Sequence, residues 1–367
     1  MAHILTNKHR VTIDVGPLLE SQWTGIPAFT RRVVQSMLQR SDVAVDFSWN
    51  LARLESTAVQ AAIQINSGAL LRDMYERQSG GGLKLVDTAQ PIFYPSVNRY
   101  HGLVSREAST VHDLSTLVMP ENHENSNVDF HLDQFAKELS TSNTVFCVST
   151  ATEAALHATY PSTKSKTRLL YQYADWPEEF EEIEKNLAPP IIGPYVVVIG
   201  TIEPRKNLAL LIRALAEPAI RDSAIKFVII GKKGWMVDSF LAELPPESKS
   251  RLLFTGFVTE FTKYRLIRHC EFMIFPSLYE GFGIPALEAM SVGKPVLASM
   301  TTSFPEVIGD GGLYFDPYSA SELALAFEEI CNVSRKIELS KKAVAHAATF
   351  NAKRLSDSLI AWIADQS

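Results

Sequence analysis

Two segments in the second half of the chain combine charged side chains with glycines. In residues 200–207, a glycine precedes Glu203 and the adjacent cations Arg205 and Lys206. A planar guanidinium and a compact ammonium, close to the free N–H groups at the start of a helix, suit a diphosphate. The same residues also fit ordinary surface charges at a solvated helix start, so the spacing alone leaves both interpretations open.

The other segment carries two glutamates, Glu280 and Glu288, with seven residues between them. Gly281 and Gly283 allow backbone N–H groups to approach a ligand closely. Carboxylates accept hydrogen bonds from hydroxyl groups, so Glu280 could hold a sugar and Glu288 a ribose diol. In the alternative interpretation, Glu280 caps the following helix and Glu288 pairs with a lysine such as Lys294.

A histidine and an aspartate follow an expected strand in the first half, within the sequence Val-His-Asp-Leu-Ser. A lone histidine is more often structural than catalytic, so His112 by itself does not define a site. Asp113 could orient the imidazole or hold the loop, and the sequence does not separate these roles.

Short apolar segments alternate with amphipathic segments along the chain. Residues 11–15, 195–200 and 226–231 are expected strands rich in Val and Ile, and a helix is expected over 27–39. This alternation indicates parallel sheets covered on both faces, which bind ligands at the carboxyl ends of their strands. A chain of 367 residues can form two such domains, and the proline pair at 189–190 is the expected boundary.

Three motifs in this order resemble the retaining glycosyltransferases of family four, and more narrowly bacterial mannosyltransferases of O-antigen and exopolysaccharide synthesis. They are Glu-Pro-Arg-Lys-Asn at 203–207, the Glu-x7-Glu spacing that ends at Glu288, and the segment 302–312, which begins with Thr-Ser-Phe-Pro-Glu-Val. The agreement is dense over residues 195–320 and scattered over the first half. The resemblance implies the α/β GT-B fold, in which two doubly wound, Rossmann-like domains face a central cleft.

Within that fold, we expect an acceptor-side domain over residues 1–188 and a nucleotide-sugar-binding domain over residues 189–345. The segment 346–367 is expected to contain a final amphipathic helix, over about 352–364, that packs back on the first domain.

The resemblance also implies roles for individual residues. The expected catalytic residues are His112, Glu280, Arg205 and Lys206. Arg205 and Lys206 would neutralise the diphosphate leaving group, while Glu280 lies beside the transferred sugar and His112 faces that sugar across the cleft. The residues expected to bind the donor are Gly25, Asp113, Gly256, Phe257, Val258, Phe282, Gly283, Ile284 and Glu288.

These donor contacts differ in chemistry. Residues 282–284 would present backbone N–H groups to the sugar and phosphates, residues 256–258 would meet the base, and Glu288 the ribose hydroxyls. Gly25 would approach the phosphates, although this sequence has one glycine where many relatives have two. Residues 231–235 are also expected near the nucleotide.

Composition excludes several classes of protein. A net charge of −6 argues against a general nucleic-acid binder. Three cysteines form no disulfide framework and suit a reducing compartment. No apolar run has the length of a signal peptide or a membrane span, so we expect a cytoplasmic protein, with peripheral contact to the inner face of the membrane if its acceptor is lipid-linked.

The expected reaction is transfer of a hexose, with mannose from GDP-mannose favoured, onto a glycan acceptor in cell-surface polysaccharide or lipopolysaccharide synthesis. No Asp-x-Asp metal motif is present, and we expect neither a metal nor another cofactor. The alternatives are a UDP-sugar donor, a sugar-nucleotide epimerase of the same fold and a non-catalytic GT-B module. An NAD-dependent dehydrogenase is disfavoured because no Gly-x-Gly-x-x-Gly follows an early strand.

Overall fold

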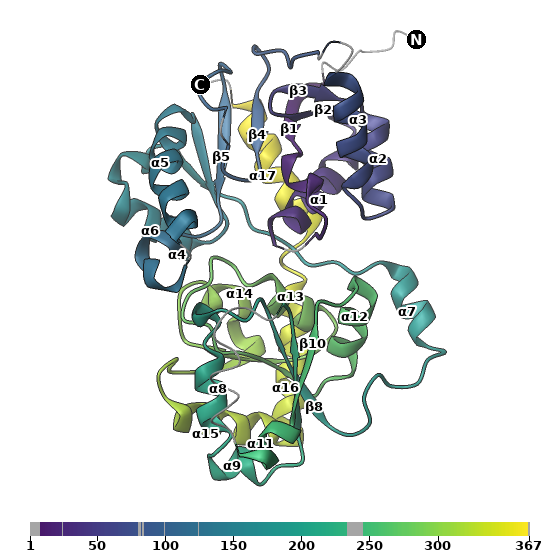
Figure 1. The fold of residues 1–367 in the computed structure, drawn as a ribbon, viewed down its shortest axis with the longest axis vertical. Helices are drawn as coiled ribbons and strands as arrows, with labels where there is room; N and C mark the ends of the chain where they lie inside the picture. The colour runs from purple at the N-terminus through teal and green to yellow at the C-terminus, as the bar shows by residue number, and fades with distance from the viewer. Residues whose placement is uncertain are drawn as a thin grey trace. The chain divides into compact units, whose positions relative to one another are not determined.

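The computed structural model describes residues 8–365, apart from residues 24, 80, 81, 83, 99, 124 and 233–244. The chain divides into two compact units (Figure 1). The first unit is Met1–Tyr173 together with Asn351–Ser367, and the second is Ala174–Phe350. Among the described helices, none has the length and apolar character needed to cross a membrane.

The first unit ends before the proline pair at which the sequence places the boundary. Residues 174–188 pack within the second unit instead, because their large side chains find partners there. The indole of Trp176 lies 5.3 Å from the ring of Tyr264, centroid to centroid. The carboxylate of Glu184 accepts a hydrogen bond from Nε of Arg265 at 2.5 Å.

The first unit is built on a seven-stranded sheet in the order β3-β2-β1-β4-β5-β6-β7. All neighbouring strands are parallel except β2 and β3. The strands are β1 His9–Asp14, β2 Val43–Trp49, β3 Ala52–Leu54, β4 Ile92–Tyr94, β5 Glu107–Val111, β6 Thr144–Cys147 and β7 Thr167–Leu169.

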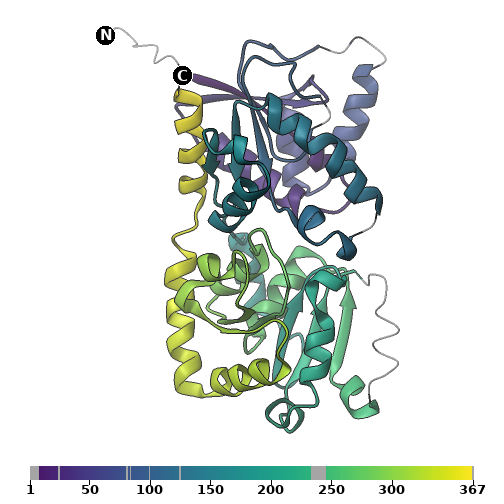
Figure 2. The same ribbon diagram turned by 90° about the vertical axis from the view of Figure 1, so that its left-hand side faces the viewer.

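The helices of the first unit include the last helix of the chain, α17. They are η1 Gly16–Leu19, α1 Ile26–Leu38, α2 Ser56–Gln64, α3 Ala69–Ser79, α4 Ser115–Val118, η2 Pro120–Asn122, α5 Asn125–Thr141, α6 Thr150–Thr159, η3 Pro161–Thr163 and α17 Ala352–Ala364. α17 is the yellow helix beside the C-terminal label in Figure 2. Its Trp362 is buried against Phe146 of β6, and its Asp357 pairs with Arg40 at 2.6 Å.

The second unit contains a six-stranded parallel sheet in the order β10-β9-β8-β11-β12-β13. The strands are β8 Tyr195–Ile199, β9 Lys226–Ile230, β10 Leu252–Gly256, β11 Met273–Phe275, β12 Val296–Ser299 and β13 Gly312–Phe315. Val196 and Val198 join a buried cluster with α8 and α15, whereas Val197 is buried on the opposite face. Burial on both faces explains why β8 is a continuous apolar run.

Helices cover this second sheet. They are α7 Glu178–Glu184, η4 Pro204–Lys206, α8 Leu208–Ala214, α9 Pro218–Arg221, α11 Pro246–Ser250, α12 Glu260–His269, α13 Ile284–Ser291, α14 Phe304–Ile308, η5 Gly309–Gly311, α15 Ala320–Cys331 and α16 Val333–Ala347. The segment 346–367 is therefore divided: α16 runs to Ala347 in the second unit, and α17 belongs to the first.

Each sheet has a point at which the strand order reverses. In the first unit it lies between β1 and β4, and in the second between β8 and β11. Loops that leave neighbouring strands in opposite directions there open a crevice at the carboxyl ends of the strands. The loops after β8 and β11 hold the two charged segments of the sequence.

Candidate functional site

The loops after β8 and β11 are joined directly, although some seventy residues separate them in the chain. The backbone N–H of Leu278 donates to the carbonyl of Arg205 at 2.8 Å. Nη1 of Arg205 donates to the carbonyl of Tyr279 at 2.9 Å, and its Nη2 to Oε1 of Glu203 at 2.8 Å. The structure therefore brings the two sequence motifs together at the switch point.

Glu280 is the carboxylate that the two cations share. Nζ of Lys206 lies 2.5 Å from its Oε1, and Nη1 of Arg205 lies 3.5 Å from its Oε2. Burial alone would raise the pKa of this carboxyl, but the charges of Lys206 and Arg205 outweigh burial and hold the pKa below its usual range. Glu280 is thus an ionised acceptor in a nearly dry setting.

Residues after β12 fix the backbone of Glu280. Its N–H donates to Oγ1 of Thr302 at 3.0 Å, and its carbonyl accepts from Oγ of Ser303 at 2.9 Å. Both residues belong to the Thr-Ser-Phe-Pro-Glu-Val motif, whose role could not be read from the sequence. The third motif therefore supports the turn that carries the glutamate.

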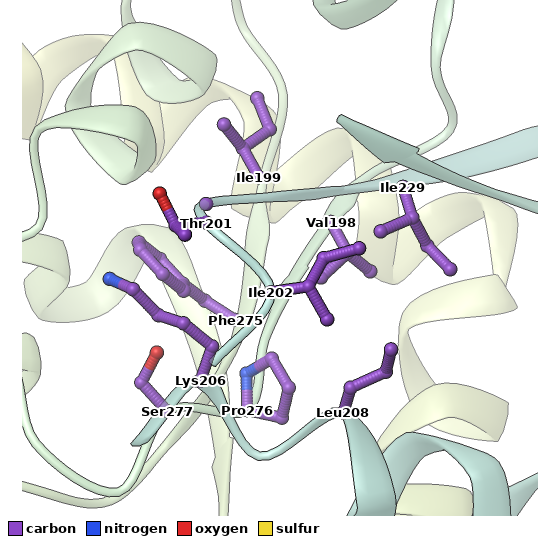
Figure 3. Close-up of a pocket in the computed structure, with 11 residues that line it drawn as sticks. Val198, Ile199, Thr201, Ile202, Lys206, Leu208, Ile229, Phe275, Pro276 and Ser277 are labelled. Atoms are coloured by element: carbon purple, nitrogen blue, oxygen red, sulfur yellow. The ribbon is translucent and has the colours of Figure 1, made fainter. Parts of the chain in front are cut away.

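A hollow of about 300 Å³, partly open to solvent, lies beside this cluster. It is lined by Val198, Ile199, Gly200, Thr201, Ile202, Lys206, Leu208, Ile229, Phe275, Pro276 and Ser277. Figure 3 shows the polar tips of Thr201, Lys206 and Ser277 on one side and aliphatic side chains on the other. An anion entering the polar side would meet the ammonium of Lys206.

The turn before α13 depends on Gly283. This residue has φ of 96°, and a Cβ placed on it would lie 2.9 Å from Cε1 of Phe304. Pro285 follows in the first turn of the helix. The backbone N–H groups of Phe282, Gly283 and Ile284 thus lie at the positive end of α13, as a phosphate site would require. The side chain of Phe282 points elsewhere, with its ring 5.7 Å from that of Phe350.

Glu288 pairs with a lysine, but not with Lys294. Nζ of Lys263, on α12, lies 2.8 Å from both carboxylate oxygens of Glu288. The indole N–H of Trp176 also donates to the backbone carbonyl of Glu288, at 3.2 Å. Nothing in the sequence near Lys263 or Trp176 indicates these contacts, because only the packing of α12 and of the segment before α7 against α13 brings them to Glu288.

The segment expected to meet the nucleotide base, residues 256–258, begins at the last residue of β10. Gly256 has φ of 68° with open space around its α-carbon, and its carbonyl accepts from the N–H of Gly231 at 3.1 Å. Phe257 is 47% exposed and Val258 is half-buried. Of the expected segment 231–235, residues 233–235 lie outside the described residues.

His112 follows β5 in the first unit, and one of its ring nitrogens makes a hydrogen bond to a backbone carbonyl. Its Nε2 lies 2.7 Å from the carbonyl oxygen of Pro95. Because a carbonyl can only accept, Nε2 carries the proton and Nδ1 of the neutral ring is an acceptor. Burial lowers the pKa of the imidazole, which favours this neutral form. The ring of Phe29 packs edge-on at 4.9 Å.

Asp113 and Gly25 have local structural roles. Oδ1 of Asp113 accepts from the N–H of Ser115 at 2.9 Å and from its hydroxyl at 2.7 Å, which holds the turn into α4. Gly25 begins α1 with φ of 56° and is exposed. Gly25 and His112 are linked through Phe29, which lies in the first turn of α1.

Among the residues that the structure describes, no three or more His, Cys, Asp or Glu side chains gather in a way that could hold a metal ion.

The part of the chain that carries this site is similar to a known family. Residues 179–350 match the family of glycosyl transferases, group 1. This part of the chain resembles group 1 glycosyl transferases. The matched residues include Arg205, Lys206, Glu280 and Glu288. The cluster at the switch point therefore lies within the part of the chain that matches the family.

The chain is also similar to proteins named as mannosyltransferases. The chain is 31% identical over 234 residues to O-antigen chain mannosyltransferase B of Escherichia coli, covering 59% of this chain and 61% of the relative. It is 36% identical over 162 residues to the serotype-specific mannosyltransferase WbdA of Escherichia coli, covering 43% and 20% of the two chains. The chain therefore spans about three fifths of the first relative and a fifth of the second.

A solved structure shares the fold across both units. The sucrose-phosphate synthase of Thermosynechococcus elongatus aligns with a TM-score of 0.68 at 18% identity, covering 96% of this chain and 98% of that one. The predicted GT-B fold and the predicted resemblance to O-antigen mannosyltransferases are thus confirmed.

Proposed function

We propose that the chain is a retaining glycosyltransferase that moves mannose from GDP-mannose onto a glycan acceptor in cell-surface polysaccharide synthesis. The observation that carries the proposal is the cluster of Arg205, Lys206 and Glu280 at the β8/β11 switch point. The mannosyltransferase relatives support the choice of sugar and of pathway. A UDP-sugar donor is the second candidate.

The cluster suits the departure of a nucleoside diphosphate. As the bond from the sugar C1 to the diphosphate oxygen breaks, negative charge grows on that oxygen. Lys206 and Arg205 stabilise this charge from fixed positions without a metal ion. Because Lys206 already pairs with Glu280, the incoming diphosphate shares its ammonium with the carboxylate.

Glu280 acts as an ionised acceptor rather than as an acid. Its lowered pKa keeps it charged at neutral pH, so it accepts hydrogen bonds from hydroxyl groups of the transferred sugar. In the proposed retaining step, the acceptor hydroxyl attacks C1 on the face from which the diphosphate leaves. The hydroxyl proton passes to the departing diphosphate oxygen, so charges and atoms balance.

The acceptor is proposed to be a growing glycan on a lipid carrier, with the enzyme in peripheral contact with the membrane. The first unit would hold this acceptor. His112, with Nδ1 as an acceptor, is proposed to bind a sugar hydroxyl.

A calorimetric binding screen tests the donor. Wild-type protein is titrated with GDP-mannose, UDP-glucose, UDP-N-acetylglucosamine and NAD, and the expected result is saturable binding of GDP-mannose alone. Binding of a UDP-sugar instead selects the second candidate, and binding of NAD alone contradicts the proposal. Turnover of the bound nucleotide-sugar without any acceptor would indicate an epimerase.

A pair of variants tests the diphosphate contact. E280Q keeps Lys206, and the double variant K206M/E280Q removes it without leaving a buried carboxylate. The double variant is expected to bind GDP at least tenfold more weakly than E280Q and guanosine equally well, because guanosine has no phosphates. K342M, a substitution of an exposed lysine on α16, is the matched control. Equal affinity for GDP in both variants would remove Lys206 from the site.

A further inference from the structure

The turn that follows β13 presents an aromatic side chain to solvent. Tyr318 is 73% exposed, although its backbone is held in place. Its N–H donates to Oδ1 of Asp316 at 2.8 Å, and the N–H of Ser319 donates to the carbonyl of Asp316 at 3.0 Å. Ser319 is also the N-cap of α15. A tyrosine on a fixed backbone loses little conformational freedom when a ligand covers its ring, so this turn suits binding.

A buried amide ties the turn to the loops of the candidate site. Nδ2 of Asn207 donates to the carbonyl of Pro317 at 2.8 Å and to that of Pro276, directly after β11, at 3.0 Å. Asn207 follows Lys206 in the chain and is buried. The strands of this sheet are parallel, so the turn after β13 lies on the same edge of the sheet as Lys206 and Glu280.

A second exposed apolar side chain follows β12, the strand between β11 and β13. Met300 is 60% exposed, and its N–H donates to the carbonyl of Phe315, the last residue of β13, at 2.8 Å. The next residue, Thr301, donates its hydroxyl to the carbonyl of Leu278 at 3.0 Å. Exposed apolar side chains thus follow both β12 and β13, on the edge of the sheet that carries Glu280.

Polar atoms beside the tyrosine ring are available to a ligand. In the part of the chain that the structure describes, Oη of Tyr318 and Oδ2 of Asp316 have no hydrogen-bond partner. A carboxylate oxygen accepts hydrogen bonds from hydroxyl groups, and a phenol both donates and accepts. A neutral sugar ring has an apolar C–H face and a rim of hydroxyl groups. It can therefore pack on the aromatic face and bind these oxygens together.

We propose that Tyr318, Asp316 and Met300 form a subsite for the glycan acceptor, which binds a sugar residue remote from the hydroxyl that receives mannose. The proposal rests on the proposed function, in which an acceptor glycan reaches the transferred sugar beside Glu280. Two strand spacings, about 10 Å, separate the ends of β11 and β13. A glycan that continues along this edge therefore meets Tyr318 only if it is several sugars long. The subsite adds a contact of the second unit to those proposed for the first, and it favours long acceptors.

The test compares acceptors that differ in length. Transfer from GDP-mannose, or from a UDP-sugar if the donor screen selects one, is measured to methyl α-mannoside and to α-linked mannotetraose. We expect wild-type protein to have a kcat/KM at least about fivefold higher with mannotetraose, because the longer glycan also contacts Tyr318. The ratio of the two kcat/KM values is the readout, since a loss of active protein lowers both values equally.

Three variants assign this preference to the turn. Y318A should move the ratio toward one through a higher KM for mannotetraose, with kcat and the affinity for GDP unchanged. Y318F keeps the aromatic face and should keep most of the ratio. D316N keeps an oxygen for the N–H of Tyr318 but loses the carboxylate, so the ratio should fall by a smaller factor than in Y318A. I337A, which truncates an exposed isoleucine on α16, is the matched control and should behave as wild-type protein.

The inference fails if wild-type protein shows no preference for mannotetraose. It also fails if Y318A slows transfer to both acceptors equally, since Tyr318 would then act on the donor site or on folding. An unchanged ratio in D316N would remove Asp316 from the subsite. If wild-type protein transfers sugar to neither acceptor, the proposed function fails and this inference fails with it. Transfer to both acceptors with the wild-type ratio in Y318A overturns the inference alone.

Discussion

The two units share a parallel-sheet architecture but hold their buried carboxylates in opposite ways. In the second unit, Glu280 and Glu288 each face a lysine. In the first unit, backbone N–H groups take the place of cations. Oδ1 of Asp14 accepts from Gly16 N at 3.0 Å, and Oε1 of Glu138 accepts from Asn98 N at 3.0 Å.

This difference shifts the pKa values of three buried carboxyl groups in opposite directions. Burial raises the pKa of Asp14 to about 7 and that of Glu138 to about 8, because dipoles compensate burial less well than full charges do. The pKa of Glu280 is lowered instead, since the cations outweigh burial. Glu138 of the first unit thus favours its protonated form at neutral pH, whereas Glu280 of the second stays ionised.

The comparison also gives the two units opposite responses to pH. A lowered pKa contributes stability above the usual pKa of the group, and that stability is lost as the pH falls. A raised pKa in an acid contributes stability at low pH, and that stability is lost as the pH rises toward the folded-state value. The stability contributed by Glu280 should therefore be lost as the pH falls below the usual pKa of 4.5, and that contributed by Glu138 as the pH rises from about 4.5 to about 8.

The largest effect is expected from K206M in the second unit. Glu280 would remain buried, and Arg205, at 3.5 Å, would be its remaining cation partner among the described residues. Breaking a buried ion pair from one side costs about 3–5 kcal/mol in the free energy of unfolding. Urea denaturation measures this loss, and K206M/E280Q should recover most of it. If K206M were as stable as wild-type protein, the ion pair between Lys206 and Glu280 would not contribute to the free energy of unfolding.

The next effect is expected from E138Q in the first unit. Wild-type stability should fall between about pH 4.5 and pH 8, the usual and folded-state pKa values of Glu138. Glutamine keeps an acceptor for Asn98 and cannot ionise, so E138Q should be more stable at pH 8.5 by roughly 2–4 kcal/mol. Urea denaturation at pH 5 and pH 8.5 measures the difference. E121Q, a substitution of an exposed glutamate, is the control. If E138Q were only as stable as wild-type protein at pH 8.5, the raised pKa of Glu138 would be contradicted.

Two glycines offer a smaller contrast between the units. G283A would combine a φ of 96° with a contact at 2.9 Å to Phe304, and we expect a loss of about 3 kcal/mol. G25A would combine a φ of 56° with open space, and we expect about 1–2 kcal/mol. Thermal unfolding measures whether G283A loses more stability than G25A. An equal or smaller loss in G283A would show that the contact with Phe304 does not add to the cost of the substitution.

The smallest effect concerns a single proton on His112. We expect the Nε2–H tautomer, because the carbonyl of Pro95 can only accept. The lowered pKa should keep the ring neutral as the pH falls through the usual value of 6.5. The ¹⁵N chemical shifts of the ring measure both properties. A protonated Nδ1 at neutral pH would contradict the assignment.

Local features of the site could be predicted from the sequence. The strand, glycine turn and helix around Glu280 follow from apolar runs, Gly283 and Pro285, all of which act over a few residues. The expected final helix over 352–364 agrees with α17 for the same reason.

Features that depend on packing between distant segments could not be predicted. Lys263 reaches Glu288 because α12 lies beside α13, and nothing near either residue indicates that pairing. Trp176 lies before the expected domain boundary, yet packs in the second unit. Glu138 looks like an ordinary helix-surface acid, and only the fold shows that it is 2% exposed.

The most direct test of the central claim is transfer of mannose from GDP-mannose by E280Q. Loss of the carboxylate should lower the rate at least about 100-fold, because the sugar loses its charged acceptor. Affinity for GDP should be unchanged or higher, because Lys206 is released from Glu280. The exposed substitution E328Q should match wild-type protein in both measurements. Wild-type transfer by E280Q would contradict the account.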